Sequence, residues 1–247
     1  MRAMPSPNFG ERAPSARIEI LLLHYTGMTS AKAACERLCD PAAEVSCHYL
    51  VDTDGAIIAM VPEEKRAWHA GVGSWAGQAD INSRSIGIEI HNPGHDNGYL
   101  PFPEVQMRSV ADLCLDILSR HQIAPTHVLA HSDTSPGRKI DPGELFDWRF
   151  LHGQGIGHWV EPEPLAEGPD ARNADHLRPG DEGASVLDLQ QSLAAYGYGI
   201  PLTGHFCAQT QAVVEAFQRH FRQAGVDGIA DRSTRATLSR LIATAPR

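Results

Sequence analysis

The chain has 247 residues, enough for one or two domains that each bury a core. Its composition is that of an ordinary globular protein, and no run of about 18 apolar residues predicts a membrane-spanning helix. The net charge of −9, from 21 Lys and Arg against 30 Asp and Glu, argues against nucleic acid or an anionic membrane as the main partner.

Residues 1–155 alternate predicted strands with predicted helices. Short apolar runs indicate buried strands, a spacing of three or four between apolar residues indicates helices, and Asp54-Gly55 indicates the turn of a hairpin. The predicted strands are 17–24, 85–90 and 128–131 with the hairpin strands 46–51 and 56–61, and the predicted helices are 30–39 and 104–121. This order predicts an α/β domain whose mixed central β-sheet is flanked by helices.

A second domain is predicted after a change in composition. Residues 156–179 are rich in Gly, Pro, Asp and Glu and have no amphipathic period, so we interpret them as a linker that proline keeps extended. Residues 180–247 carry apolar residues at helical spacing in three segments, which are 184–196, 210–221 and 233–241. We therefore expect a small three-helix C-terminal domain.

Thirteen histidines in an acidic chain direct attention to metal ligands. His24 and His131 each end a predicted central strand, and such strand ends can meet at one edge of a sheet. Asp141 follows in a loop that contains prolines and a glycine, which can return its carboxylate to the same point. A catalytic zinc ion needs three protein ligands and an open fourth position. The alternative is that both imidazoles are ordinary hydrogen-bonded histidines.

Five segments surround these three residues in the chain. They are LLLHYTGM (21–28), SCHYLVDTDG (46–55), AWHAGVGSW (67–75), INSRSIGIEIHNPG (81–94) and AHSDTSPGRKIDPG (130–143). In this order they resemble the zinc-dependent N-acetylmuramoyl-L-alanine amidases of the amidase-2, or AmpD-like, type, over about residues 15–155. The resemblance implies that His24, His131 and Asp141 bind one Zn²⁺. It also implies that Glu89 is the general base and that Lys139 stabilises the transition state, with a solvated surface charge as the alternative for each.

The resemblance further implies a reaction. It is hydrolysis of the amide bond between N-acetylmuramic acid and the L-alanine of the stem peptide, in peptidoglycan degradation or recycling and including 1,6-anhydro-muropeptides. Residues 180–243 resemble the three-helix peptidoglycan-binding domain of many wall hydrolases, so muropeptides and peptidoglycan fragments are the expected partners. We expect small muropeptides to be cleaved without residues 176–247. Two alternatives are a recognition protein that binds peptidoglycan uncut and a zinc endopeptidase that cuts within the stem peptide.

Some residues near these motifs are weaker candidates for substrate contact. They are His69, Trp68, Asn82 and Asn92. A structural hydrogen bond for the histidine, core packing for a tryptophan and turn capping for the asparagines are the alternatives. His91 receives no role.

The five cysteines are interpreted as free thiols, because their number is odd and a chain of this length needs no disulfide framework. Cys35, Cys39, Cys47 and His48 have the spacing of a second metal site, but cysteines four apart on an alanine-rich helix favour a packed core. Residues 1–17 contain no apolar signal-peptide core. We therefore expect a cytoplasmic protein, with a periplasmic protein whose signal has been removed as the alternative.

Overall fold

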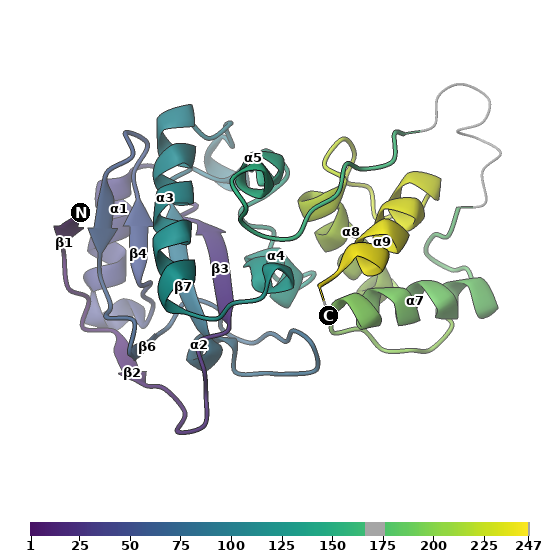
Figure 1. Cartoon of the computed structure of the whole chain (residues 1–247), viewed down its shortest axis with the longest axis horizontal. Coiled ribbons are helices and arrows are strands. Elements are labelled where there is room, and N and C mark those ends of the chain that lie inside the picture. Colours follow the sequence, from purple (N-terminus) through teal and green to yellow (C-terminus); the bar gives the residue numbers. More distant parts are fainter. Residues whose placement is uncertain (166–175, 247) are drawn as a thin grey trace.

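The computed structural model describes residues 1–165 and 176–246, which form an α/β domain and a helical domain (Figure 1). The α/β domain contains a six-stranded sheet and a separate two-stranded pair. The sheet consists, in spatial order, of β1 (Arg2–Ala3), β5 (Ile57–Ala59), β4 (Tyr49–Val51), β7 (Ser85–Ile90), β3 (Ile20–Tyr25) and β8 (Val128–Ala130), and the pair consists of β2 (Phe9–Glu11) and β6 (Lys65–Ala67). Within the sheet, β4 and β5 are antiparallel and the other neighbours are parallel, so the predicted mixed sheet is confirmed.

Helices cover both faces of this sheet (Figure 1). In this domain the helices are α1 (Ala31–Cys39), α2 (Ile81–Arg84), α3 (Glu104–Arg120), α4 (His131–Thr134) and α5 (Trp148–Gly153). The long helix α3 packs against Leu21 and Leu23 of β3, and α1 packs on the opposite face against Leu50 of β4. Because side chains alternate along a strand, His24 points away from α3, toward the face that carries α1.

The strand predicted at 128–131 ends one residue earlier, at Ala130, and His131 is the first residue of the short helix α4. The carboxylate of Asp133 explains this change. Its Oδ2 accepts a hydrogen bond from the backbone N–H of Ala130 at 2.8 Å and so caps the first turn of the helix. His131 therefore lies at a strand-to-helix junction whose backbone is fixed by its own neighbours.

The three predicted C-terminal helices are confirmed. They are α7 (Ala184–Tyr196), α8 (Ala208–Phe221) and α9 (Arg232–Thr244). Their buried apolar side chains form a common core that includes Val186, Leu189, Leu193, Val213, Phe217 and Leu238. In the described part of the chain, no helix has the length and apolar character needed to cross a membrane.

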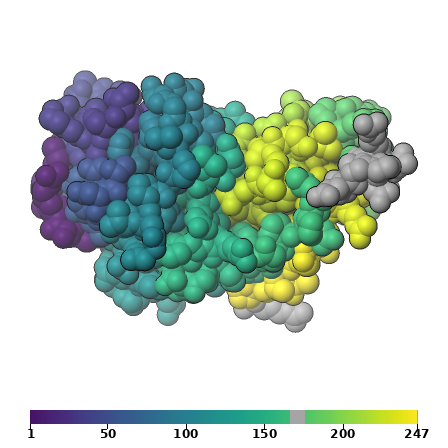
Figure 2. Space-filling model, turned by 90° about the horizontal axis from the view of Figure 1, so that it is seen from above, coloured from purple at the N-terminus to yellow at the C-terminus, as the bar shows by residue number. Residues whose placement is uncertain are grey.

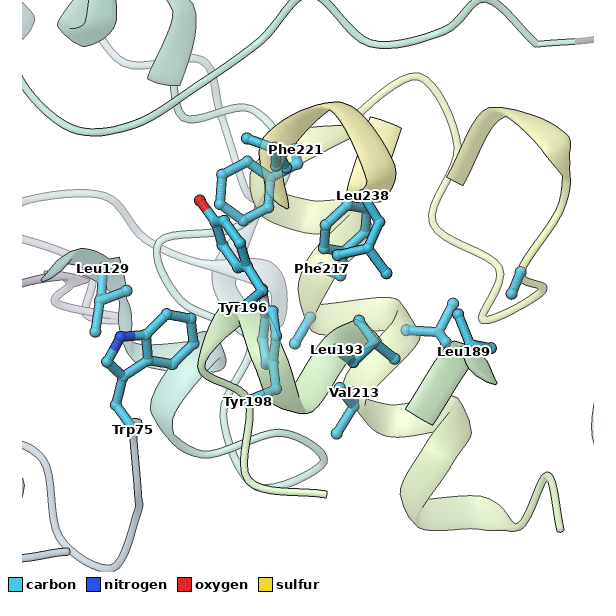
Figure 3. Close-up of a cluster of buried hydrophobic side chains, with 14 of the residues drawn as sticks. Trp75, Leu129, Leu189, Leu193, Tyr196, Tyr198, Val213, Phe217, Phe221 and Leu238 are labelled. Carbon is cyan, nitrogen blue, oxygen red and sulfur yellow. The ribbon is translucent and has the colours of Figure 1, made fainter. Parts of the chain in front are cut away.

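The two domains share one continuous apolar cluster. Trp75, in the loop after β6, is 1 % exposed, and its ring centroid lies 5.0 Å from that of Tyr198 in the helical domain (Figure 3). On the side of the α/β domain the cluster continues to Leu129 of β8. The space-filling view shows the two domains in direct contact (Figure 2). Helix α4 also contacts α8, so the helical domain packs against the segment that carries His131.

The first part of the predicted linker lies against both domains. Ile156 is buried in the core of the α/β domain, and His158 Nδ1 is 2.9 Å from the hydroxyl of Tyr196 in α7. Residues 166–175 of the predicted linker lie outside the described residues.

Candidate metal centre and active site

Three side chains meet at the edge of the sheet where β3 and β8 end. His24 Nδ1 and His131 Nδ1 are 2.9 Å apart, and they lie 3.1 and 3.0 Å from Asp141 Oδ2. In a tetrahedral zinc site with bonds of about 2.0–2.1 Å, ligand atoms are about 3.3 Å from one another, so these donors are within about half an ångström of that spacing. All three residues are buried, and among the described residues no other group of His, Cys, Asp or Glu is arranged to hold a metal ion.

Each imidazole is oriented through its second ring nitrogen. His131 Nε2 donates a hydrogen bond to the Ala70 carbonyl oxygen at 2.9 Å. His24 Nε2 lies 3.0 Å from His69 Nδ1. A neutral ring that donates through one nitrogen presents a lone pair on the other, which is the form that binds a metal ion. Both Nδ1 atoms are therefore available as ligands.

A chain of polar groups fixes the contact between His24 and His69. Ser85 Oγ donates to the Ile81 carbonyl oxygen at 2.6 Å and lies 3.3 Å from His69 Nε2, which donates to it. His69 Nδ1 is then the acceptor for the N–H of His24. Gly87 makes room for this arrangement, because a Cβ there would lie 2.5 Å from the His69 ring. Glycine is thus required on β7 for the ring to cross the strand and reach His24.

Glu89 lies beside His24, because the two residues pair in the register of the parallel strands β3 and β7. Its Oε2 is buried and has no hydrogen-bond partner among the described residues. Burial, with the charge of Asp141 adding to it, raises the pKa of Glu89 well above its ordinary value. An unpaired carboxyl group with a raised pKa in a cleft is typical of a proton-transfer group, and this argues against a solvated surface charge.

The protonation states of His24 and Asp141 suit a metal ion. Burial lowers the pKa of His24 to about 4, with the neighbouring His131 adding to the effect. Burial opposes the charge on Asp141, yet the imidazoles of His131 and His24 hold the pKa of this carboxyl well below its ordinary value. A neutral imidazole and an ionised carboxylate are forms that coordinate metal ions.

The ligands open into a cavity of about 490 Å³. Four further residues singled out in the sequence line it, namely Glu89, Lys139, His69 and Trp68. Other lining residues include Tyr25, Arg37 and Asp96. Four of the five segments quoted from the sequence thus bring charged or aromatic side chains to one cavity, and the segment 46–55 contributes Ser46.

The two candidate asparagines serve the backbone and do not line this cavity. Asn82 Oδ1 accepts hydrogen bonds from the N–H groups of His69 at 3.1 Å and Ala70 at 2.8 Å. Asn92 Oδ1 accepts from the N–H of Gly94 at 3.0 Å, which is turn capping. Asn82 therefore supports the segment that orients both imidazole ligands, and Asn92 shapes a turn.

Cys35, Cys39, Cys47 and His48 do not form a group that could hold a metal ion in the described part of the chain. All five cysteines are free, and Cys35 and Cys47 are buried in the cluster beneath α1. His48 is buried, and its Nδ1 accepts a hydrogen bond from the N–H of Gly87 at 2.9 Å.

Three residues with no role in the sequence analysis meet at the domain boundary: Asp133, Tyr198 and His220. Asp133 carried a local signal, because an acidic residue in the first turn of a helix is a common cap. No local pattern places Tyr198 and His220 beside it, since they follow it by 65 and 87 residues.

Comparison with known proteins assigns the chain to a family. Residues 14–144 match the family described as N-acetylmuramoyl-L-alanine amidase, and residues 182–238 match a peptidoglycan binding domain. The chain therefore belongs to the N-acetylmuramoyl-L-alanine amidase family of the amidase-2 type.

Individual relatives match over both domains or over part of the chain. The chain is 35% identical to the N-acetylmuramoyl-L-alanine amidase AmiD of Escherichia coli, over 94% of this chain and 84% of AmiD. It is 32% identical to the 1,6-anhydro-N-acetylmuramyl-L-alanine amidase AmpD of Citrobacter freundii, over 60% of this chain and 86% of AmpD. A crystal structure of AmpDh3 from Pseudomonas aeruginosa superposes with a TM-score of 0.79 at 31% identity, and each chain is covered completely. E. coli AmiD, in complex with the substrate anhydro-N-acetylmuramic acid-L-Ala-D-gamma-Glu-L-Lys, superposes with a TM-score of 0.75 over 96% of this chain and 97% of AmiD.

Proposed function

We propose that this protein is a zinc-dependent amidase that hydrolyses the bond between N-acetylmuramic acid and the L-alanine of the stem peptide. The observation that carries the proposal is the meeting of two imidazole Nδ1 atoms and one carboxylate oxygen beside the unpaired carboxyl group of Glu89. Membership of the amidase family and the similarity to AmiD and AmpD support the same reaction.

His24, His131 and Asp141 would hold one Zn²⁺. Their donor set, two imidazoles and a carboxylate, is of the kind found in catalytic zinc sites, where a fourth position stays open. Bound there, the ion supplies a water of lowered pKa and polarises the carbonyl group that is attacked. The protein contributes the orientation of the three ligands, which His69 and the Ala70 carbonyl group provide through hydrogen bonds.

Glu89 moves the proton. Burial raises its pKa above the ordinary value, which makes the carboxylate a stronger base that can accept a proton from the attacking water and return it to the leaving nitrogen. Because Oε2 makes no hydrogen bond within the described residues, no such bond has to break for it to act. Its place on β7, in register with His24, holds it next to the reacting atoms.

Lys139 stabilises the oxyanion that develops on the substrate carbonyl group. It lines the cavity two residues before Asp141, and its backbone N–H donates to the Ser135 carbonyl oxygen at 3.0 Å. One donor aimed at a developing oxyanion is typically worth about 3 kcal/mol.

The two aromatic candidates have different tasks. His69 uses Nδ1 for His24 and Nε2 for Ser85, so its hydrogen bonds orient a metal ligand and leave none for substrate. Trp68 lines the same cavity, and its side chain makes no hydrogen bond among the described residues. It is therefore the candidate for contact with sugar or peptide.

The helical domain would hold the enzyme at peptidoglycan and raise the local concentration of substrate. AmpDh3 was also solved in complex with an anhydromuramic pentapeptide, and AmiD with an anhydro-muramyl peptide. On this similarity we extend 1,6-anhydro-muropeptides to this chain as substrates. The cytoplasmic location stays a prediction, which fractionation of cells would test.

Product masses test the proposal. Zinc-loaded protein is incubated with anhydro-muropeptides, with reduced muropeptides and with whole sacculi. We expect release of an intact stem peptide that begins with L-alanine, and release slowed by ~10²-fold or more in the isosteric variant Glu89→Gln. Binding without any product would indicate a recognition protein, and cleavage within the stem peptide would indicate an endopeptidase. Either outcome contradicts the proposal.

A further inference from the structure

Asp133, two residues after the metal ligand His131, is fully buried at the domain boundary. Its Oδ1 accepts a hydrogen bond from the hydroxyl of Tyr198 at 2.6 Å, and its Oδ2 lies 2.7 Å from His220 Nδ1, which donates to it. Both partners belong to the helical domain. Tyr198 follows α7, and His220 lies in the last turn of α8. The α/β domain contributes the backbone N–H of Ala130.

The two donors from the helical domain stabilise Asp133 in its place. A carboxylate that is buried without enough donors is costly, because it has lost its hydration. Asp133 also caps the helix that begins at His131, so its position sets the backbone that carries the ligand. The hydrogen bonds across the domain boundary therefore influence the position of His131 through a single residue, Asp133.

Packing holds both donors in position. The His220 ring stacks on Trp148 of α5, with centroids 3.7 Å apart, and the Tyr198 ring meets Trp75 edge to face. Burial raises the pKa of Tyr198 well above its ordinary value, and the charge of Asp133 adds to this. The hydroxyl group thus remains protonated and can donate.

The helical domain also contacts the loop that follows Ala70, whose carbonyl oxygen accepts the second hydrogen bond of His131. The carbonyl oxygen of Ala70 orients its Nε2, and the loop that follows Ala70 enters the helical domain. There the N–H of Ala76 donates to the Gly197 carbonyl oxygen at 2.8 Å, and a Cβ on Gly197 would lie 2.6 Å from the Trp75 ring. The fit between loop and domain is close, so a shift of one moves the other.

We propose that Tyr198 and His220 are positioning residues for the metal site: through Asp133, the helical domain holds His131 in place and so raises the affinity for zinc. This inference rests on the proposed function in taking zinc as the bound ion. The helical domain then supports the metal ligand in addition to binding peptidoglycan. Removing residues 176–247 should therefore weaken zinc binding, whereas the sequence led us to expect an independent first domain.

The test compares two tyrosines of the helical domain. Tyr198→Phe removes the hydroxyl that binds Asp133 and keeps the ring. Tyr196→Phe is the matched control, because its hydroxyl is also buried but binds His158 and makes no hydrogen bond with Asp133 among the described residues. Zinc dissociation constants are measured by competition with a chelator. We expect a value about ten times higher for Tyr198→Phe, the lower end of the usual effect of outer-shell partners, and a value near that of the unmodified protein for Tyr196→Phe.

Two further readouts separate positioning from a general loss of stability. Excess zinc should restore most of the activity of Tyr198→Phe, because the chemistry itself is untouched. Hydrogen exchange should quicken in the peptide that contains residues 130–141 and stay unchanged in β3. Should Tyr198→Phe fail to fold, His220→Asn decides, since its amide can donate from near the position of Nδ1. We expect it to bind zinc more tightly than His220→Leu.

Equal zinc affinity in both tyrosine variants, or an equal loss in both, would overturn the proposal. For the histidine pair, equal affinity in His220→Asn and His220→Leu would overturn it. Failure of the proposed function gives another result. In that case the unmodified protein binds zinc in a manner that depends on Tyr198, but it releases no peptide from muropeptides.

Discussion

The two imidazole ligands are supported by different parts of the molecule. His24 lies at the end of β3, between two neighbouring strands, and its orienting chain of His69, Ser85 and Ile81 lies wholly within the α/β domain. His131 starts a helix of four residues that is anchored through Asp133 to the helical domain. From the sequence, the helical domain is expected to be a separate wall-binding module. The comparison shows that this domain contacts the supports of His131 but, among the described residues, makes no hydrogen bond to those of His24.

The largest expected effect concerns Glu89, which orients neither His24 nor His131. Glu89→Gln should keep zinc bound and lower kcat by ~10²-fold or more, the usual loss when a general base is removed. Turnover at saturating zinc, with the metal content measured beside it, checks this. Full activity in the variant would remove Glu89 from the mechanism.

The same variant should be more stable than the unmodified protein when metal is absent. The folded-state pKa of Glu89 is raised, so its contribution to stability is fully present below its ordinary pKa and is lost as pH rises through the folded value. Above its ordinary pKa, Glu89 must either take up a proton or carry a buried charge in the folded state, a cost in stability that glutamine does not have. Thermal unfolding in a chelator at pH 8 and at pH 4 should show a gain for Glu89→Gln at the higher pH only.

The next prediction concerns Asp133, which supports His131. Asp133→Ala leaves the hydroxyl of Tyr198 and the ring of His220 without their acceptor, and we expect a loss of about 3 kcal/mol in the free energy of unfolding. Urea unfolding measures it. Asp147→Ala is the control, because Asp147 caps α5 at an exposed position and its loss should cost about 1 kcal/mol. Similar costs in both variants would mean that the boundary network stabilises little.

The side of His24 has a matching test. His69→Phe removes the acceptor for His24 Nε2 and should weaken zinc binding about 10- to 100-fold, whereas His69→Asn can keep an acceptor oxygen and should lose less. Combined with Tyr198→Phe, the two losses in binding free energy should add, since the side chains of His69 and Tyr198 belong to different hydrogen-bond networks. If the loss in zinc-binding free energy of the double variant differs strongly from the sum of the two single losses, the supports of His24 and His131 are coupled. The contrast between the two ligands would then be wrong.

The last effect is a dependence on acid. Burial lowers the pKa of His24 to about 4 and that of His48 to about 3. Each is neutral in the folded state, so stability is present above pH 6.5 and is lost as pH falls below it, by up to about 1.4 kcal/mol per pH unit for each histidine. His48→Asn can keep an acceptor for the N–H of Gly87 but cannot be protonated, so the metal-free variant should lose less stability between pH 6.5 and 4.5. If stability falls equally with pH in the variant and in the unmodified protein, His48 is not the source of the acid sensitivity.

Sequence analysis could predict the elements whose signal is local. The strand 85–90 and the helix 184–196 were placed at the observed bounds, because a continuous apolar run and a long helical period leave little choice. The ligand and base positions followed from strand ends and from the resemblance to the amidases. Strands of two or three residues, such as Arg2–Ala3, carry no pattern and form only through pairing with distant strands.

The domain boundary could not be predicted in the same way. Composition identified residues 156–179 as non-helical, but composition does not indicate whether the domains on either side pack together. The contact of Asp133 with His220 joins residues 87 positions apart, and nothing near Trp75 in the sequence indicates that its ring packs against Tyr198 of the other domain. Such contacts depend on the relative placement of whole domains, which one sequence does not specify.

X-ray absorption of the zinc-loaded protein tests the central claim most directly. We expect a first shell of nitrogen and oxygen at about 2.0–2.1 Å with the scattering of two imidazoles, and one imidazole fewer in His24→Ala. A sulfur ligand at about 2.3 Å, or a spectrum unchanged by His24→Ala, would contradict a site built from His24, His131 and Asp141.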